Sequence, residues 1–337
     1  MAKSKLTLQQ RKRIRDTRSR TSAVPANEAK LDVLLASGEL GSEQRGTVIT
    51  RYSNQADVLS QRAPEQPLRK CYFRSHLESL VTGDEVMWRD GEPYGVICSV
   101  LPRNSQLDRP DNRGKIRTVV ANIDTVVIVV APQPQAHAEL IDRYLVACEH
   151  HRIAAILVVN KLDLGGEALK RVLDLVTTYR DIAYPVLEVS ATTGEGISEL
   201  AGHLAKKTSV FVGQSGVGKS SLINALCPPA GAKVGALSEA KARGRHTTTT
   251  ADLFLLASGG SIIDSPGIRE FALLHLNQSE LANGFREFRP FLGRCKFRNC
   301  RHLDEPHCAL REACANGEIS PQRLSSFHRI VDSQAHL

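Results

Sequence analysis

Residues 208–227 read TSVFVGQSGVGKSSLINALC and contain three consecutive structural signals. The apolar run TSVFV precedes a glycine-rich loop, and the amphipathic stretch KSSLINALC follows it. A strand, a G-x-x-x-x-G-K-[ST] loop and a helix in this order predict a phosphate-binding loop, because backbone N–H groups and the helix N-terminus then face one anion. Lys219 is expected to reach the β- and γ-phosphates, and Ser220 to coordinate Mg²⁺. The predicted phosphate contacts are Gly213, Gln214, Ser215, Gly216, Val217, Gly218, Lys219, Ser220 and Ser221.

Around this segment, from Ile116 onward, apolar strand candidates alternate with helical stretches. The strand candidates are DTVVIVVA, AAILVVN, YPVLEVS, TADLFLLA and GSIID. Continuous apolar strands separated by helices indicate a mainly parallel sheet that is covered on both faces. The predicted fold class is therefore α/β.

Three further motifs stand at the ends of predicted strands. The tetrapeptide Asn160-Lys161-Leu162-Asp163 ends the strand AAILVVN, and the carboxylate of Asp163 can accept from guanine N1–H and from the guanine 2-amino group, which adenine cannot match. Ser190 and Ala191 follow YPVLEVS and are expected to close over the base. In the run DSPG, Asp264 fits a water-mediated Mg²⁺ contact and Gly267 a backbone N–H to the γ-phosphate. Together the motifs predict GTP binding.

The order of these motifs is circularly permuted relative to ordinary small GTPases, because the N-K-x-D motif precedes the phosphate loop. Permutation changes the connections between strands but not their contacts. The run RGRHTTT lies where the first switch should be, and we choose Thr248 among its threonines as the Mg²⁺ ligand. Ile268 stands where many GTPases place a water-positioning Gln, so intrinsic hydrolysis should be slow. His246 is a candidate to orient the water; the alternative is an exposed loop histidine that contacts RNA or nothing.

A metal motif of the form C-x4-C-x-H-x5-C follows near the C-terminus. Three thiolates and one imidazole close a structural Zn²⁺ site, around which a small segment could fold. The predicted ligands are Cys295, Cys300, His302 and Cys308, with His307 and Cys314 as alternatives. Arg294, Lys296, Phe297, Arg298 and Arg301 are interleaved with the ligands, an arrangement that suits RNA backbone contact and base stacking.

Short alternating strands with turn signals between them occupy the N-terminal part and predict a five-stranded OB-type β-barrel, whose open face commonly binds oligonucleotides. A purely structural barrel is the alternative. The polar stretch 103–115 is interpreted as a linker. The expected domains are a basic disordered tail (1–36), the barrel (37–112), the permuted GTPase domain (113–275) and a helical zinc-binding module (276–337).

Charge and composition narrow the possible partners. The net charge is +8, and residues 1–30 carry nine Lys/Arg against two acids. Clustered basic residues favour a polyanion as the binding partner, with nucleic acid preferred over membrane because no amphipathic apolar face accompanies the charge. A solvated tail without a ligand is the alternative.

No apolar run is long enough for a membrane span. The eight cysteines, in a chain without an export signal, suggest reduced thiols or metal ligands. A cytoplasmic protein is expected.

With its permuted motif order and its metal motif, the chain resembles the RsgA family of circularly permuted GTPases over roughly residues 40–315. The resemblance implies a GTP hydrolase that assists late maturation of the small ribosomal subunit, contacts its rRNA through the OB fold, and turns over slowly until the subunit stimulates it. It also supports the first four zinc ligands and a catalytic role for His246. We expect a monomer that binds one structural Zn²⁺, and Mg²⁺ with GTP. The alternatives are a GTPase acting on another RNA or on the large subunit, and a GTP-gated RNA-binding factor whose hydrolysis is incidental.

Overall fold

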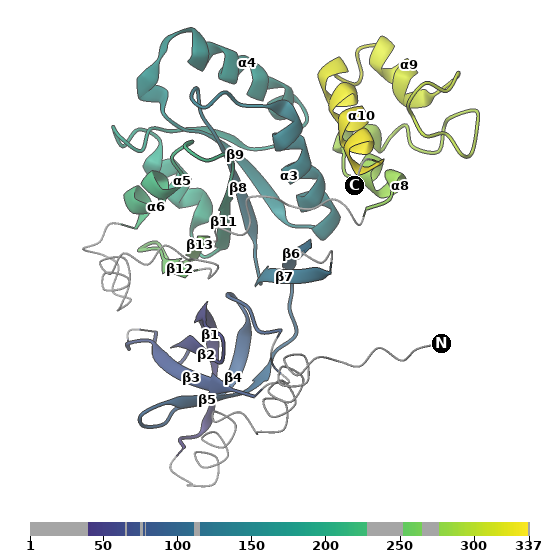
Figure 1. Cartoon of the computed structure of the whole chain (residues 1–337). Coiled ribbons are helices and arrows are strands. Elements are labelled where there is room, and N and C mark those ends of the chain that lie inside the picture. Colours follow the sequence, from purple (N-terminus) through teal and green to yellow (C-terminus); the bar gives the residue numbers. More distant parts are fainter. Residues whose placement is uncertain are drawn as a thin grey trace, which may run out of the picture. The chain divides into compact units, whose positions relative to one another are not determined.

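A computed structural model describes residues 40–64, 66–74, 77, 79–110, 115–227, 252–264 and 276–335. The chain divides into two compact units (Figure 1). The first contains the residues up to Leu80 together with Val86–Leu101, and the second contains Val81–Glu85 and Pro102–Leu337.

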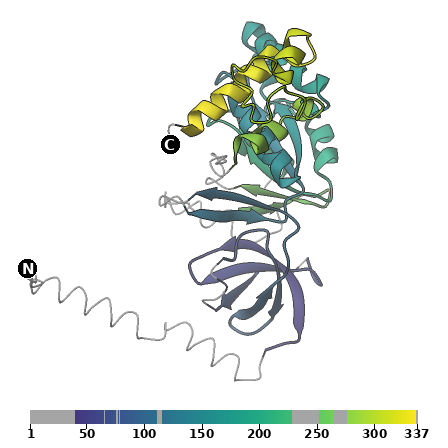
Figure 2. The ribbon, with the colours of Figure 1, turned by 90° about the vertical axis from the view of Figure 1, so that its right-hand side faces the viewer.

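The first unit is a β-barrel (Figure 2). Its strands are β1 (Glu43–Arg51), β2 (Gln55–Ser60), β3 (Arg69–Phe73), β4 (Glu85–Arg89) and β5 (Gly95–Val100). They follow the order β1-β2-β3-β5-β4, and an additional β1–β4 pairing closes the barrel. Inward-facing apolar residues fill it around Trp88, which is 1% exposed, with Val48 and Val58 packed in the same cluster. The five-stranded barrel predicted from the short alternating strands is confirmed.

The second unit is built on a six-stranded sheet with the order β10-β9-β8-β11-β13-β12. Its strands are β8 (Thr125–Val130), β9 (Ala154–Val159), β10 (Val186–Glu188), β11 (Thr208–Val212), β12 (Asp252–Leu255) and β13 (Ser261–Asp264). The first five strands in this order are parallel, and only β12 runs antiparallel to its neighbour β13. The predicted α/β class with a mainly parallel sheet is confirmed.

Helices cover both faces of this sheet (Figure 1). The helices of the second unit are α3 (Ala138–His151), α4 (Gly166–Asp181), α5 (Ile197–Leu204), α6 (Lys219–Leu226), α8 (Gln278–Asn283), α9 (Ala309–Ala315) and α10 (Pro321–Ala335), with the 3-10 turns η2 (Leu162–Leu164) and η4 (Arg286–Phe288). α5 and α6 pack with alternate strand residues, including Val127 and Val129, in one core cluster. α3 contacts β8 and β9, while α4 contacts β9 and β10 and reaches α3 through Tyr179. Burial on both faces explains why the strands read as continuous apolar runs.

The segment after the six-stranded sheet forms a C-terminal module, which we define as residues 276–335. Its helix α10 packs against α8 and α9 of the module, and also against α3 of the sheet domain. Its core contains three aromatic rings: Phe285 stacks on Phe288 with centroids 4.7 Å apart, and Phe327 meets both edge-on. Across the described ranges, no helix combines the length and apolar character needed to cross a bilayer.

One prediction about the fold is wrong. The stretch 103–115, interpreted as a linker, contains the strand β6 (Gln106–Pro110), which pairs antiparallel with β7 (Ile116–Ala121). The sequence of β6 is polar, but its one aliphatic side chain, Leu107, is 1% exposed. Beside this hairpin, Arg103 forms a bidentate pair with the fully buried carboxylate of Asp84, at 2.7 and 3.0 Å. The polar sequence of this segment does not reveal that it pairs with β7, and this pairing makes it part of the folded domain.

Candidate functional site

The parallel strands place the predicted nucleotide motifs at one edge of the sheet. Asn160 follows β9, Ser190 follows β10 shortly after its end, Gly213 follows β11, and Asp264 ends β13. Because parallel strands end at the same edge, residues distant in sequence become neighbours there. The strand that carries the phosphate loop, β11, lies between β8 and β13 in the middle of the sheet.

The phosphate loop wraps tightly because glycine occupies the positions that other residues would block. Gly213 has φ +134°, and a Cβ there would lie 2.2 Å from the Val129 carbonyl oxygen. Gly218 has φ +94°, and a Cβ there would lie 2.4 Å from the side-chain nitrogen of Asn160. Both backbone conformations are strained for residues with a side chain. The loop can therefore bring its N–H groups close to an anion.

Lys219 begins helix α6, so its side chain starts at the positive end of the helix dipole. Its ammonium group donates to the carbonyl oxygens of Gly213 and Gln214, each at 2.7 Å. The remaining predicted phosphate contacts, Ser215, Gly216, Val217, Ser220 and Ser221, lie in the same loop and in the first turn of α6. A cation and the first helical N–H groups thus converge where a triphosphate would bind.

The side chain of Asn160 connects the N-K-x-D motif to the glycine-rich loop. Its side-chain amide donates to the Val217 carbonyl at 2.9 Å, and its side-chain oxygen accepts from the Ala191 N–H at 3.2 Å. The side chain is 1% exposed, so both bonds are protected from water. Three motifs that are far apart in sequence, and permuted in order, therefore meet at one asparagine.

Asp163 is positioned by Ser190. The Ser190 hydroxyl donates to a carboxylate oxygen of Asp163 and accepts from the Thr193 N–H at 3.2 Å. Ser190 is fully buried, while Asp163 is exposed in the turn η2, next to Leu162. A buried hydroxyl that orients an accessible carboxylate suits the recognition of two N–H donors on a planar base.

A loop that the sequence motifs did not reveal also borders the site. Residues 131–137 connect β8 to α3, so they start at the same sheet edge. Lys161, which has φ +68°, donates through its ammonium group to the Gln133 carbonyl at 2.9 Å. A Cβ on Gly216 would lie 3.6 Å from the Pro134 ring. The only sequence signal for this loop is its position after an apolar strand.

Some predicted site residues lie outside the described residues. They are Thr248, His246 and Gly267, together with Ile268 and the rest of the RGRHTTT run. Asp264, the first residue of DSPG, is described and is half-buried at the end of β13.

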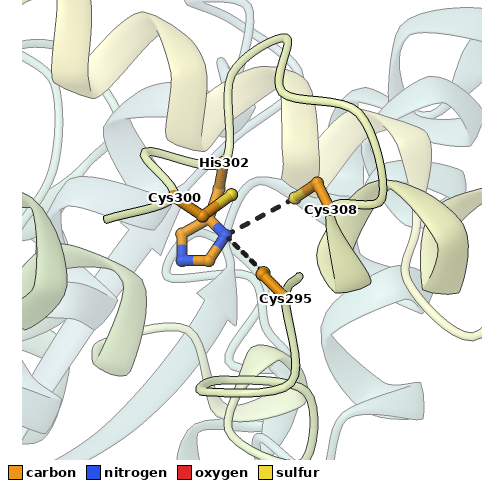
Figure 3. A group of neighbouring side chains, drawn as sticks. All are labelled: Cys295, Cys300, His302 and Cys308. Carbon is orange, nitrogen blue, oxygen red and sulfur yellow. Dashed lines mark hydrogen bonds between the residues drawn. The ribbon is translucent and has the colours of Figure 1, made fainter. Parts of the chain in front are cut away.

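The C-terminal module contains a cluster of three cysteines and one histidine (Figure 3). The ligand atoms of Cys295, Cys300, His302 and Cys308 all lie within 4.8 Å of one another. His302 Nδ1 is 3.4 Å from the Cys295 sulfur and 3.5 Å from the Cys308 sulfur. Tetrahedral Zn²⁺ with Zn–S bonds of about 2.3 Å and Zn–N bonds of about 2.0 Å would separate sulfur and nitrogen by about 3.5 Å. The donor set and its spacing therefore fit one Zn²⁺.

The surroundings of this cluster support a metal site. The Ala309 N–H donates to the Cys295 sulfur at 3.4 Å, and His328 donates to the His302 carbonyl at 2.7 Å. Burial lowers the pKa of His302, which favours the neutral imidazole that binds metals. Burial raises the pKa of the Cys300 thiol to about 12, so a bound cation has to supply the charge that stabilises its thiolate.

The two alternative ligands lie apart from this group. Among the described residues, the cluster that can hold a metal consists of the four predicted side chains and includes neither His307 nor Cys314. His307 is exposed, and Cys314 is half-buried in α9. Of the remaining cysteines, Cys71, Cys148 and Cys227 are buried and Cys98 is half-buried.

The loop between the first two zinc ligands presents basic and aromatic side chains. Phe297 is 43% exposed, and the Lys296 ammonium lies 5.8 Å from its ring centroid. Arg294 and Arg298 are exposed beside them. An accessible ring among cations has the properties of a base-stacking and phosphate-binding surface.

Comparison with known proteins gives matches over nearly the whole chain. The family model described as RsgA GTPase matches residues 100–274. The small ribosomal subunit biogenesis GTPase RsgA of Hahella chejuensis is 48% identical over 337 residues, which covers 99% of this chain and 97% of that protein. The RsgA of Azotobacter vinelandii is 49% identical, with 99% and 98% covered.

Two solved structures are similar in fold. The crystal structure of YjeQ from Thermotoga maritima matches with a TM-score of 0.72 and 34% identity, covering 87% of this chain and 99% of that chain. The structure of YloQ, described as a circularly permuted GTPase, matches with a TM-score of 0.69 and 26% identity, covering 88% and 96%. Identity near one half along almost the full length means that the chain belongs to the RsgA GTPase family.

Proposed function

We propose that this chain hydrolyses GTP, binds the small ribosomal subunit and assists its late maturation. The observation that carries the GTPase part is the hydrogen bond from Asn160 to the Val217 carbonyl, which joins base recognition to phosphate binding. The ribosomal part rests on the relatives, which are named small ribosomal subunit biogenesis GTPases. Hydrolysis is slow in the isolated protein and faster on the subunit.

In this mechanism Asp163 recognises the guanine base. Its carboxylate accepts from guanine N1–H and from the 2-amino group, while Ser190 holds the carboxylate in place. Lys161 extends along the base, anchored at the Gln133 carbonyl. Adenine has no N–H donors at these two positions, so the carboxylate would stay without hydrogen-bond donors. Leaving this charge unpaired would greatly weaken the binding of adenine nucleotides.

The phosphates are held by the loop Gly213–Ser221. Its N–H groups and Lys219 neutralise the charge of the β- and γ-phosphates. Ser220 and Thr248 would hold Mg²⁺, with Asp264 acting through a water molecule; the metal neutralises charge on the phosphates when bound. The Gly267 N–H is assigned to the γ-phosphate.

Hydrolysis requires a water molecule that is oriented for attack on the γ-phosphate. We assign the orientation of this water to His246. Ile268 has no polar atom on its side chain and cannot replace a water-positioning Gln. A histidine that contacts the substrate only in the assembled complex would account for slow turnover in isolation.

The subunit is contacted by the barrel and by the C-terminal module. Basic residues on the zinc loop, with Phe297 exposed among them, support contacts with rRNA backbone and unpaired bases. We assign the tail to 1–36, the OB barrel to 37–112, the GTPase domain to 113–275 and the zinc module to 276–337. We further propose that the protein acts as a monomer in the cytoplasm, where its ribosomal partner is assembled.

The test is GTP turnover measured alone, with purified small subunits and with purified large subunits. We expect at least a several-fold increase with small subunits only. The Lys219→Ala variant controls for contaminating nucleotidases and should stay inactive in all three conditions. Equal rates with and without small subunits, or equal stimulation by large subunits, would contradict the proposal.

A further inference from the structure

A buried arginine connects the C-terminal module to the GTPase sheet. Arg323, in the first turn of α10, is 0% exposed. Its guanidinium donates to Asp142 of α3 and to both carboxylate oxygens of Glu287 in η4, the latter at 2.6 and 3.2 Å. Asp142 also accepts from the Tyr179 hydroxyl of α4 at 2.7 Å. One side chain therefore spans the module and two helices of the GTPase domain.

Aromatic rings complete the enclosure of this cation. The Arg323 guanidinium carbon lies 4.4 Å from the Phe285 ring centroid and 5.4 Å from that of Tyr179. A buried ionic group is a poor source of stability, because desolvation offsets the attraction. It does demand a single geometry, since any other arrangement leaves a buried charge unpaired. The network therefore fixes how α10 sits on α3.

The other end of α3 is held in the same way. Glu149 accepts from Arg286 and Arg289 of the module, the second at 2.7 Å. The Arg286 guanidinium also lies 3.9 Å from the ring centroid of Tyr184. Asp142 and Glu149 lie about two turns apart on one helix. The module is thus attached to α3 near both ends.

The N-terminal side of α3 leads into the nucleotide site. In the loop 131–137, which precedes α3, the Gln133 carbonyl accepts a hydrogen bond from the Lys161 ammonium. Pro134 of the same loop lies beside Gly216 of the phosphate loop. A groove of about 430 Å³ is lined by Pro132 and Ala136 of the same loop and by Gln322, the residue before Arg323. Residues 131–137 continue directly into α3, so a shift of this loop would move the start of α3.

We propose that α3 and the C-terminal module move as one body, and that Arg323 is the positioning residue that couples the module to the nucleotide site. The inference rests on the proposed function, in which the module contacts the small subunit. Coupling between two ligands is reciprocal, so subunit affinity and nucleotide state must change each other by the same factor.

The experiment measures that factor. Small-subunit affinity is determined with GDP and with a non-hydrolysable GTP analogue, and the ratio of the two dissociation constants gives the coupling. We expect a ratio of about tenfold in the parent protein. Arg323→Lys keeps the charge but lacks the planar fork with which the guanidinium donates to both oxygens of Glu287 and to Asp142, so the ratio should fall towards one. Nucleotide affinity without subunits and zinc content should stay at parent values.

The matched control is Arg329→Lys, an exposed position on the same helix, which should keep the parent ratio. A parent ratio in the Arg323→Lys variant, or a ratio of one in the parent, would overturn the inference. If the variant does not fold, hydrogen exchange of the unmodified protein decides: replacing GDP with the analogue should change protection in α3 and α10 together. Unchanged protection in both helices would overturn it. Subunit-stimulated turnover of the parent tests the proposed function separately.

Discussion

The side-chain amide of Asn160 donates to the backbone carbonyl of Val217 at 2.9 Å, although 57 positions separate the two residues. The bond runs from the N-K-x-D motif to the glycine-rich loop. It shows that the circularly permuted order of the motifs along the chain still brings the two motifs into contact in the fold. If the two motifs bind one nucleotide, as proposed, this bond holds the base contacts and the phosphate contacts together, and it gives the first prediction.

Replacing Asn160 with Ala should lower the affinity for GDP and GTP by roughly ten- to a hundredfold, because the Val217 carbonyl and the Ala191 N–H would lose a buried partner worth about 1–3 kcal/mol. Titration with a fluorescent guanine nucleotide measures the effect. Thr177→Ala, on the exposed side of α4, is the control and should bind as the parent does. Parent affinity in Asn160→Ala would show that the bond does not support the site.

Replacing Asp163 with Asn should exchange the base preference. The Asn side chain offers an NH₂ donor where guanine also presents a donor, so GTP affinity should fall roughly a hundredfold or more. Xanthine carries a carbonyl in place of the 2-amino group and should gain affinity. Competition between GTP and xanthosine triphosphate for one fluorescent nucleotide measures the change. An unaltered preference would remove Asp163 from base recognition.

A methyl group added at Gly218 should disrupt the phosphate loop. The backbone there has φ +94°, and the new Cβ would approach the Asn160 side-chain nitrogen to 2.4 Å. Gly218→Ala should therefore lose measurable GTP binding. Gly202→Ala is the matched control: its Cβ meets no atom within 4 Å, and Ala in helix α5 should stabilise the protein by about 0.5–1 kcal/mol. Urea denaturation and nucleotide titration of both variants check these outcomes.

Removing one zinc ligand should release the metal and loosen the module. Cys300→Ser should bind less than one Zn²⁺ per chain and should melt earlier, because the small module depends on the metal for part of its stability. Cys314→Ser is the control, since Cys314 lies outside the cluster. Metal content by mass spectrometry and thermal melting distinguish the two. Full zinc occupancy in Cys300→Ser would contradict the ligand assignment.

Acidification should weaken the contact between α3 and the module. Burial alone would raise the pKa of the Glu149 carboxyl, but hydrogen bonds from its two arginine partners and from Tyr184 lower it below its ordinary value of 4.5. A lowered folded-state pKa contributes stability at neutral pH, which is lost as the pH falls below about 4.5 and through the folded-state pKa.

Glu149→Gln should therefore cost about 1 kcal/mol of unfolding free energy at pH 7, a modest figure because both arginines are partly exposed. The difference from the parent should shrink towards pH 3.5. Glu139→Gln, which removes an ordinary pair with Arg143 on the same helix, should change stability by only tenths of a kcal/mol. A difference that grows on acidification would contradict this account.

Local signals in the sequence predicted the sheet, the barrel, the phosphate loop and the cysteine–histidine cluster, because each has a spacing that reflects its own geometry. Arg323 carries no such signal: it looks like one more surface charge, and its partner Asp142 is 181 positions away. The strand β6 was missed for the same reason, since its polar residues are stabilised by a partner strand. His246 and Thr248 lie outside the described residues and stay predictions.

The central position of β11 has a consequence for synthesis of the chain. Within this sheet, ribosomes make β8, β9 and β10 before β11, and these strands can pair as they emerge. One edge of β8 stays unpaired until β11 has been made. A nascent chain that ends at α5 contains Asp163 but does not yet contain the glycine-rich loop, so it cannot bind a triphosphate through that loop. The enzyme is therefore unable to consume nucleotide until most of its length has been translated.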